Sequence, residues 1–321
     1  MRINGFLTLF PLALAAPAYA QESNITSLPS QSAPARAEVD GTGRFASPNG
    51  QLGAGLSFDP AQRGRAHIEL AIMHQQAGVT TGGYSQHTHM TSLTWLIGGG
   101  YKVVPNVELE AFLPMGWVNV GQTIEGPALP SQSRDRGGTA VGNLHLGASY
   151  LLAREHIRLK IGGALEWGPW THDLTAVPAL AIALGNNARG GQDIGLWAPE
   201  VFSVVTPARF EYGERLVFTG DAQLGLHFPT NDGDTQLSLQ VAPGVGFYAT
   251  DMVLVGARLP FIWVPTGSGD NAQTAFEPYA RLDLDNAFIN TRFTLNLDEP
   301  LGFGFDSGKY WAWHVGGGGT F

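Results

Sequence analysis

The chain contains no cysteine, and this absence removes several classes of function at once. Without thiols there is no disulfide scaffold, no thiol catalysis and no cysteine-based metal site. A lipid anchor on a cysteine is excluded for the same reason. Basic residues are also scarce, with 18 Lys and Arg against 27 Asp and Glu and a net charge of −9. This balance argues against nucleic acid as a partner and against a basic patch that binds anionic headgroups.

Long apolar runs are equally scarce. The one candidate, residues 6–16, follows Arg2 and precedes Ala18-Tyr19-Ala20, a small-x-small cleavage site. It is shorter than the ~20 residues that a membrane-spanning helix needs. Residues 1–20 are therefore predicted to be a secretory signal peptide. Residues 21–64 are rich in Ser, Pro, Gly, Gln and Ala without any period, which predicts a flexible periplasmic leader or a loose plug.

From residue 65 onward apolar and polar residues alternate, which is the period of a β-strand. Glycine is abundant, at 43 of 321 residues, and only 14% of residues are charged. The pattern predicts an all-β fold, a closed antiparallel transmembrane β-barrel of about 12 strands over residues 65–321. The expected strands are 65–75, 91–104, 106–119, 139–153, 155–168, 194–206, 208–228, 235–250, 252–264, 274–285, 287–297 and 309–321.

The gaps between these strands alternate in length. Tight turns are expected at 104–106, 154–155, 206–207, 250–251 and 285–286, and longer loops at 76–90, 120–138, 169–193, 229–234, 265–273 and 298–308. Short turns on one side and long loops on the other are typical of outer-membrane barrels, whose short turns are periplasmic. A soluble meander has no reason to separate loop lengths in this way.

One face of the expected strands is uncharged. On the seventh strand, for example, it reads Leu216, Phe218, Ala222, Leu224, Leu226 and Phe228. A charge on such a lipid-facing surface would cost about 2–4 kcal/mol at mid-bilayer. Trp117, Trp167 and Trp263 fall at the loop ends of their strands and are predicted to form an outer aromatic girdle.

The opposite face carries the charges and is predicted to line the lumen. Its members are Glu69, Lys102, Glu108, Glu110, Arg158, Lys160, Glu166, Arg215, Asp221, Arg258, Glu277, Arg281, Asp283 and Arg292. Lys102 and Glu108 flank the turn at Pro105 symmetrically, so they can face each other across a hairpin. Two interpretations stay open, a self-neutralising network that holds the interior together and a water-filled pathway whose charges select a solute.

The last strand ends the chain on Phe321. Counting back by two gives Gly319, Gly317, Val315, Trp313 and Trp311 on one face. This strand resembles the closing strand of bacterial outer-membrane barrels, where a terminal Phe is the assembly signal, although that family carries bulkier residues where Gly317 and Gly319 stand. The resemblance implies the barrel-assembly machinery as a partner.

A second resemblance concerns residues 140–152, where Gly142, Leu146, Gly147 and Tyr150 match a strand of the outer-membrane MetA-pathway family linked to phenol degradation. Asn143 stands where that family usually has Asp. The tract 101–110 with Leu113-Pro114 is also similar to it. The resemblance covers about two hairpins and implies a transporter of small compounds, hydrophobic ones among them.

Two loop features stand out. His87 and His89 lie at i and i+2, a weak metal-site candidate without a nearby carboxylate, and a polar pair at the loop rim is favoured. Residues 174–184 are the one helix-compatible stretch, which predicts a short helix that folds into the barrel mouth.

Enzymatic machinery is not evident. His227 and Ser238 lie on nearby strands without an acidic partner placed by spacing, and there is no Gly-x-Ser-x-Gly elbow and no phosphate-binding loop. The sequence therefore predicts a monomer without cofactor in the outer membrane of a Gram-negative bacterium, a channel or transporter for a small solute. The alternatives are a structural barrel with a closed, charge-networked lumen and, third, a lipid-modifying enzyme.

Overall fold

The structure is a computed structural model that describes residues 62–81, 84–126, 129–171, 174–231, 233–266, 271–297 and 310–321. The predicted signal peptide lies outside the described residues, as does the predicted leader or plug except for its last three residues.

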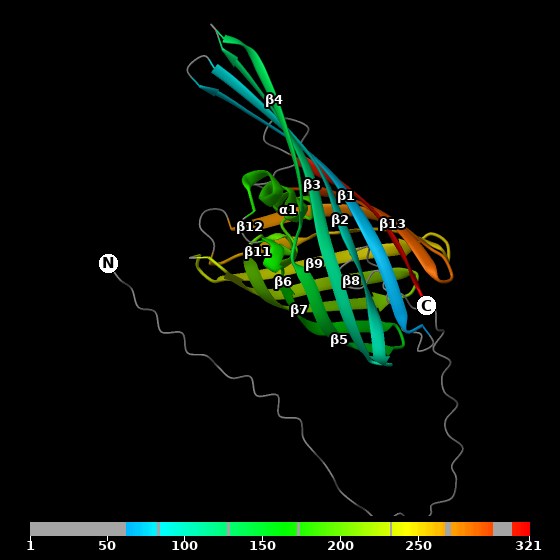
Figure 1. The fold of residues 1–321 in the computed structure, drawn as a ribbon. Helices are drawn as coiled ribbons and strands as arrows, with labels where there is room; N and C mark the ends of the chain where they lie inside the picture. The colour runs from blue at the N-terminus through cyan, green and yellow to red at the C-terminus, as the bar shows by residue number, and fades with distance from the viewer. Residues whose placement is uncertain are drawn as a thin grey trace, which may run out of the picture. The chain divides into compact units, whose positions relative to one another are not determined.

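Strands make up most of the described chain (Figure 1). Their bounds are β1 Gly64–Thr81, β2 Tyr84–Val104, β3 Val107–Gly126, β4 Leu129–Val141, β5 Leu144–Arg154, β6 Ile157–Trp167, β7 Val201–Gly213, β8 Leu216–Pro229, β9 Gln236–Tyr248, β10 Val253–Arg258, β11 Phe261–Trp263, β12 Ala272–Asp283, β13 Ala287–Asn296 and β14 Tyr310–Thr320. β4 and β5 both pair with β3, and β10 and β11 both lie between β9 and β12. The segments therefore build twelve strands, as predicted.

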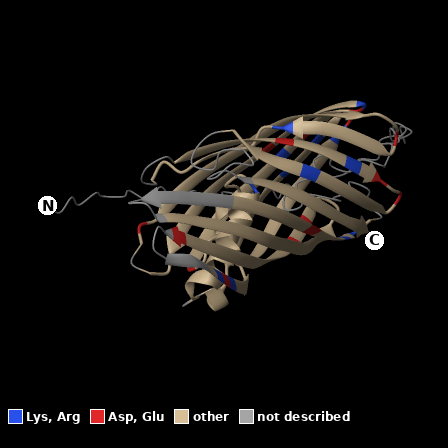
Figure 2. Ribbon diagram, turned by 90° about the horizontal axis from the view of Figure 1, so that it is seen from above, with Lys and Arg blue, Asp and Glu red and all other residues tan. Residues whose placement is uncertain are grey.

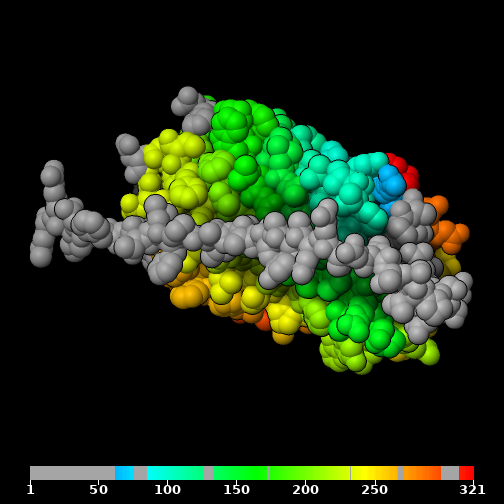
Figure 3. Space-filling view, turned by 90° about the horizontal axis from the view of Figure 1, so that it is seen from below, coloured from blue at the N-terminus to red at the C-terminus, as the bar shows by residue number. Residues whose placement is uncertain are grey.

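The barrel is closed because β1 pairs antiparallel with β14 as well as with β2. The start of the barrel and the end of the chain consequently lie side by side (Figure 3). Phe321 completes this seam, since its amide donates to Gly64 O at 2.9 Å and its carbonyl accepts from Gly64 N at 2.8 Å. A closed ladder pairs the backbones of neighbouring strands all the way round, which is what a bilayer requires of a β-structure.

The outward face of the wall is apolar. Its exposed side chains include Ile68, Leu109, Ile161, Phe218, Leu224, Val245, Ile289 and Phe293. Charged residues occupy little of the ribbon (Figure 2). Trp167 and Trp263 are exposed and Trp117 is half-buried at the loop ends of their strands. The fold and this uncharged belt confirm the predicted transmembrane β-barrel.

Four of the five predicted tight turns are present, and the fifth was misplaced. The sequence predicted a turn at Thr206–Pro207, but both residues lie inside β7, and the predicted start at residue 194 is helical. Pro207 is accommodated because the β6–β7 ladder is interrupted there, between the pairs Ile161↔Ala208 and Ala164↔Val205. The turn instead follows Gly213, whose φ of 117° strongly favours glycine.

Two predicted loops, 76–90 and 120–138, are largely strand. β1 and β2 pair up to Thr81↔Tyr84, and β3 and β4 pair up to Gly126↔Leu129 (Figure 1). The sequence does not reveal these extensions because a strand beyond the apolar belt has no lipid-facing side, and so its residues show no apolar period of two.

The wall changes its pairing at Gly142 and Asn143, between β4 and β5. β5 pairs with both β3 and β6, whereas in the described part of the chain β4 pairs with β3 alone. The Asn143 side-chain amide is turned to the connection after β6, where it donates to the carbonyls of Gly195, Ala198 and Val201 at 2.7, 2.9 and 3.1 Å. One edge of β4 therefore has no strand partner among the described residues.

The connection between β6 and β7 contains the helices, η1 Pro169–Thr171, α1 Ala176–Ala188 and α2 Ile194–Trp197. The predicted helix over 174–184 is therefore confirmed and runs four residues further. Among the described residues no helix is long and apolar enough to cross a membrane. Ala181, Leu184 and Ala188 of α1 pack against Met73 of β1 and Val118 of β3, which are inward-facing wall residues. α1 thus lies within the barrel.

Candidate functional site: a charged lumen closed by a helix

Most of the charged residues expected in the lumen are buried. Glu69, Lys102, Glu108, Glu110, Lys160, Glu166, Asp221, Arg258, Glu277, Arg281 and Arg292 are all less than 5% exposed, or 6% for Asp221. Arg158 and Asp283 are partly exposed. Arg215 departs from the prediction, because it lies in the β7–β8 turn with an exposed side chain over the Phe247 ring. The misplaced turn at Pro207 caused this error.

One group of ion pairs joins β1, β3 and β6. Arg65 donates to Glu108 at 2.7 Å and to Glu110 at 3.0 Å, and Lys160 also bonds Glu110. Lys160 lies 3.6 Å from Glu108 as well. Each of the two carboxylates is therefore shared between an arginine and a lysine. Lys102 and Glu108 stand opposite each other in the β2–β3 register, as predicted.

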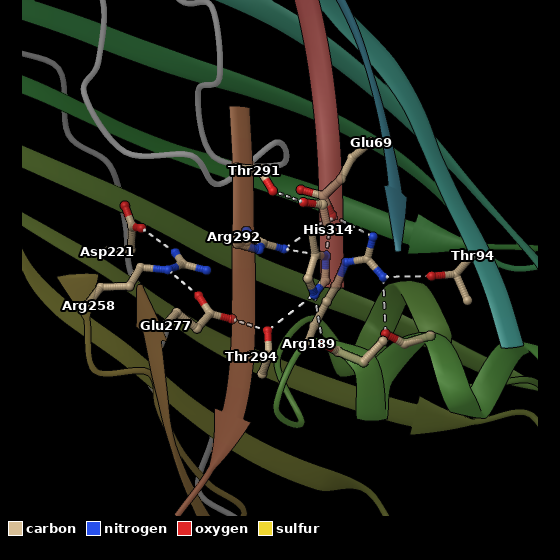
Figure 4. A network of polar contacts seen from close by, with 12 residues as sticks. Glu69, Thr94, Arg189, Asp221, Arg258, Glu277, Thr291, Arg292, Thr294 and His314 are labelled. Carbon is tan, nitrogen blue, oxygen red and sulfur yellow. Dashed lines mark hydrogen bonds and ion pairs between the residues drawn. The ribbon is translucent and has the colours of Figure 1, made fainter. Parts of the chain in front are cut away.

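A second group crosses the other half of the barrel (Figure 4). Arg258 bonds Glu277 and donates to Asp221 at 3.1 Å. Thr294 donates to Glu277 at 2.7 Å and contacts His314 Nε2 at 3.2 Å. Buried charges are costly unless they are paired, so the loss of one partner would leave an uncompensated charge on a neighbouring strand.

The helix connection joins this group through Arg189, the residue after α1. Its guanidinium donates to Glu69 of β1 at 2.8 Å and stacks over Trp197 of α2 with 4.5 Å to the ring centroid. Arg292 of β13 donates to the same Glu69 oxygen at 3.1 Å. One wall carboxylate therefore holds both a wall arginine and the arginine of the connection.

Three further contacts fix the connection inside the barrel. His314 Nε2 of β14 lies 2.9 Å from Ala188 O, and Asp193 N donates to Gln240 of β9 at 3.0 Å. The helix fits closely against β4, since a Cβ on Gly138 would lie 2.8 Å from Val177 Cγ1. The helix is thus held at both ends.

Asp193 is the connection's buried acid. Burial raises the pKa of its carboxyl from the ordinary value to about 7, against the opposing effect of Arg189. Asp193, Asp221, Gln223 and Gln240 line a void of about 10 Å³ between the connection and the wall. A space of this size holds no more than about one water molecule, so this void provides no passage.

A larger hollow lies at the wall itself. Leu113 of β3, Val141 of β4 and Trp170 of η1 line about 410 Å³ of open apolar space. Trp170 is fixed there because its indole N–H donates to Gly142 O at 2.8 Å. The hollow lies next to the residues where β4 and β5 part, and Gly142 is packed closely there, since a Cβ on it would lie 2.6 Å from Leu196 O and 3.5 Å from Ile182 Cγ2.

The possible hydrolytic residues are buried. His227 lies between two hydroxyls, with Ser238 Oγ 2.7 Å from Nε2 and Ser203 Oγ 2.8 Å from Nδ1. Both serines are fully buried, and a Cβ on Gly195 of α2 would lie 2.6 Å from Ser203 Oγ. α2 therefore packs directly against Ser203.

His87 and His89 lie on the upper part of β2, both exposed. Their register partners on β3 are Thr123 and Gly121. The described residues contain no group of three or more His, Asp or Glu that could hold a metal ion.

Several lumen residues were missed by the sequence analysis, namely Arg65, His145, Arg189, Arg209, Glu211 and His314. Arg209 pairs with Glu211 at 3.2 Å, and both were left out although they share the inward phase of Asp221 in the predicted strand 208–228. His145 lies 2.9 Å from Glu166, and its inward phase was a usable signal. Arg189 lies outside any strand, so strand periodicity could not find it.

No family model matches the chain, and no curated protein matches it. Solved structures do resemble it. The COG4313 outer membrane channel from Pseudomonas putida F1 is 13% identical with a TM-score of 0.51, covering 81% of this chain and 96% of that one.

Two further similar structures have lower TM-scores. The CymD monoaromatic hydrocarbon channel is 9% identical with a TM-score of 0.39, covering 81% of this chain and 89% of that one. A FadL homologue from Pseudomonas aeruginosa is 10% identical with a TM-score of 0.38, covering 82% and 91%.

The likeness to the Pseudomonas putida structure concerns the fold, and the apolar belt supplies the physical reason for it. A closed barrel with an uncharged outer surface is stable only where lipid surrounds it. The chain is therefore a β-barrel of the Gram-negative outer membrane.

Proposed function

We propose that this barrel is an outer-membrane channel for a small hydrophobic solute. The observation that carries the proposal is the apolar hollow lined by Leu113, Val141 and Trp170, beside the edge of β4 that has no strand partner in the described part of the chain. The hollow is shallow and open, and its three lining side chains are apolar, so a small aromatic or short aliphatic compound could pack against it from the lipid side.

The charged lumen is unsuited to an apolar solute, so we propose that the solute passes at the wall rather than through the lumen. The buried ion pairs around Glu110 and Glu277 would bind no apolar solute, because it could not replace their partners. A solute in the hollow instead lies on the outer side of the wall, against the exposed side chains of Val141 and Trp170. The Pseudomonas putida protein that shares the fold is described as a channel, which agrees with this proposal.

The second candidate function is a structural barrel with a closed lumen. It is favoured by the small size of the void under the connection, about 10 Å³, and by the mutual pairing of the buried charges. The assembly role of Phe321 and the monomeric state are proposed alongside both functions.

Filling the hollow separates the two functions. Val141→Trp places a large ring in the hollow, and Ile161→Trp adds the same ring elsewhere on the exposed belt. We expect Val141→Trp to lower uptake of a hydrophobic aromatic probe by expressing cells at least fivefold and Ile161→Trp to leave it unchanged. Equal uptake in the parent, in both variants and in cells without the protein would favour the structural barrel.

A further inference from the structure

The connection between β6 and β7 is not needed to complete the barrel wall. The ladder closes without the connection, from the β1–β2 pairing round to β13–β14 and β14–β1, although β4 pairs with β3 alone among the described residues. α1 adds no strand and contributes side-chain and capping contacts alone. Displacing the connection would break the backbone hydrogen bonds from Asn143 N to Leu196 O at 2.9 Å and from Thr230 N to Glu200 O at 2.8 Å, and would leave the strand-to-strand hydrogen bonds of the wall intact.

Specific contacts nevertheless hold the connection inside the barrel, and we refer to this arrangement as the closed state. Arg189 is 2% exposed and bonds both Glu69 and, through Nη1, Gly185 O at 3.1 Å at the helix end. Its guanidinium also stacks on Trp197, so it ties α1, α2 and β1 together. A buried ion pair contributes little net stability but fixes one arrangement, which is the behaviour of a latch.

Several residues that follow Arg189 have a left-handed backbone conformation. Gly190 and Gly191 have φ values of +64° and +81°, and Asp193 and Glu200 follow with +63° and +58°. Left-handed conformations in non-glycine residues are strained and persist only where their surroundings impose them. Release of the contacts would let these residues relax, as hinge positions do.

The closed state also leaves polar atoms unsatisfied. Trp197 Nε1 and Glu69 Oε2 are buried and have no partner among the described protein atoms. Such groups lose their hydration without a compensating bond. Water that enters as the connection lifts would restore it, which lowers the cost of opening.

From these observations we propose that residues 174–200 form a displaceable plug, closed by the Arg189–Glu69 ion pair, and that the open barrel conducts ions past the charged wall. This inference concerns an ion-conducting route through the lumen and goes beyond the proposed uptake of a hydrophobic solute at the wall. It differs from a permanent filling of the lumen in that breaking one ion pair should shift an equilibrium.

Two variants test the plug by single-channel recording in a planar bilayer. Arg189→Gln removes the latch charge, and Arg134→Gln removes an equal charge on exposed β4. We expect Arg189→Gln to raise open probability at least tenfold over the parent and Arg134→Gln to leave it unchanged. Equal open probability in all three proteins would overturn the latch.

A disulfide lock tests the movement without relying on the latch. A Cβ on Gly190 would lie 3.1 Å from Ala275 Cβ of β12, so Gly190→Cys with Ala275→Cys joins the plug to the wall after a shift of a few tenths of an ångström. Cysteine at position 190 must keep a φ of +64°, which is strained in a non-glycine residue, and the absence of native cysteine makes the pair unique. The control pair, Gly147→Cys with Ala164→Cys, joins β5 to β6 at 3.0 Å. Oxidation should abolish openings in the plug pair alone, and reduction should restore them.

The outcomes also separate this inference from the proposed function. If the oxidised lock abolishes channel openings, the plug is supported. Failure to take up the aromatic probe would then contradict only the proposed hydrophobic solute. Openings unaffected by the oxidised lock overturn the plug, whatever the uptake assay gives. The absence of conductance from Arg189→Gln that folds normally would overturn it too.

Discussion

Arg189 and Glu69 lie 120 positions apart in the chain, yet their side chains meet inside the barrel at 2.8 Å. Glu69 also accepts from Arg292 at 3.1 Å, so one carboxylate compensates two buried arginines. We expect Glu69→Ala to destabilise the barrel by about 3–5 kcal/mol, because both cations would remain buried without it. The midpoint of urea unfolding, followed by tryptophan fluorescence, measures the loss.

A matched control for this change is Glu214→Ala. Glu214 pairs with His156 at the exposed turns, where its side chain is 77% exposed. An exposed pair contributes about 0–1 kcal/mol, so the unfolding midpoint should barely move. Equal losses in the two variants would show that Glu69 has no special role in the interior.

The belt gives a second prediction from two neighbouring residues on β8. Leu224 is 46% exposed on the lipid side, whereas Gln223 is 2% exposed inside. Leu224→Arg should cost about 2–4 kcal/mol at mid-bilayer. Heat-modifiable migration on a gel, which reports barrel folding, should show a reduced folded fraction.

Gln223→Leu should be neutral or stabilising in the same assay. Both atoms of the Gln223 amide are buried and lack a partner among the described protein atoms, so replacing the amide removes an unsatisfied group. An arginine is a poorer control at this position, because the adjoining void holds only about 10 Å³. A larger loss of folded fraction for Gln223→Leu than for Leu224→Arg would contradict the assignment of Leu224 to the lipid side and Gln223 to the interior.

The seam predicts the effect of shortening the chain by one residue. Deleting Phe321 removes both backbone hydrogen bonds to Gly64, which extend the β1–β14 closure. The ring itself is 75% exposed and adds little packing, so its recognition during assembly is the larger expected loss. Surface labelling of expressing cells should show severalfold less protein in the outer membrane, and an undiminished level would speak against the assembly role.

The pH dependence of the plug follows from Asp193. Burial raises the pKa of this carboxyl to about 7 in the plugged state, near Arg189, Glu166, Arg292 and Arg258. A raised acid pKa means that the plugged state binds the proton more tightly, so its stabilisation is full below the ordinary pKa of about 4 and is lost as pH rises through 7. Open probability should therefore be lower at pH 5.5 than at pH 8.5.

Asp193→Asn tests whether this residue is the sensor. The amide is neutral at every pH, so the variant should stay mostly plugged and lose the pH dependence. An unchanged pH response in Asp193→Asn would assign the effect to other groups.

The faces of the wall were predictable from the sequence because strand alternation has a period of two and lipid excludes charge from one side. Leu224 and Gln223 could therefore be assigned correctly without a structure. The preference of proline for turns gave a wrong prediction at Pro207. This proline lies inside β7, where it is tolerated because β6 does not pair with β7 at that level. No local pattern could place Arg189 against Glu69, since that contact depends on how the whole connection folds back into the barrel.

The most direct test of the channel proposal compares two solutes of similar size in cells that express the barrel and in cells that do not. One is a small hydrophobic aromatic and the other a sugar, and the rate of uptake is measured for each. The apolar hollow beside Trp170 predicts faster uptake of the aromatic with no change for the sugar. Faster uptake of the sugar alone, or of neither solute, would contradict a channel for hydrophobic compounds.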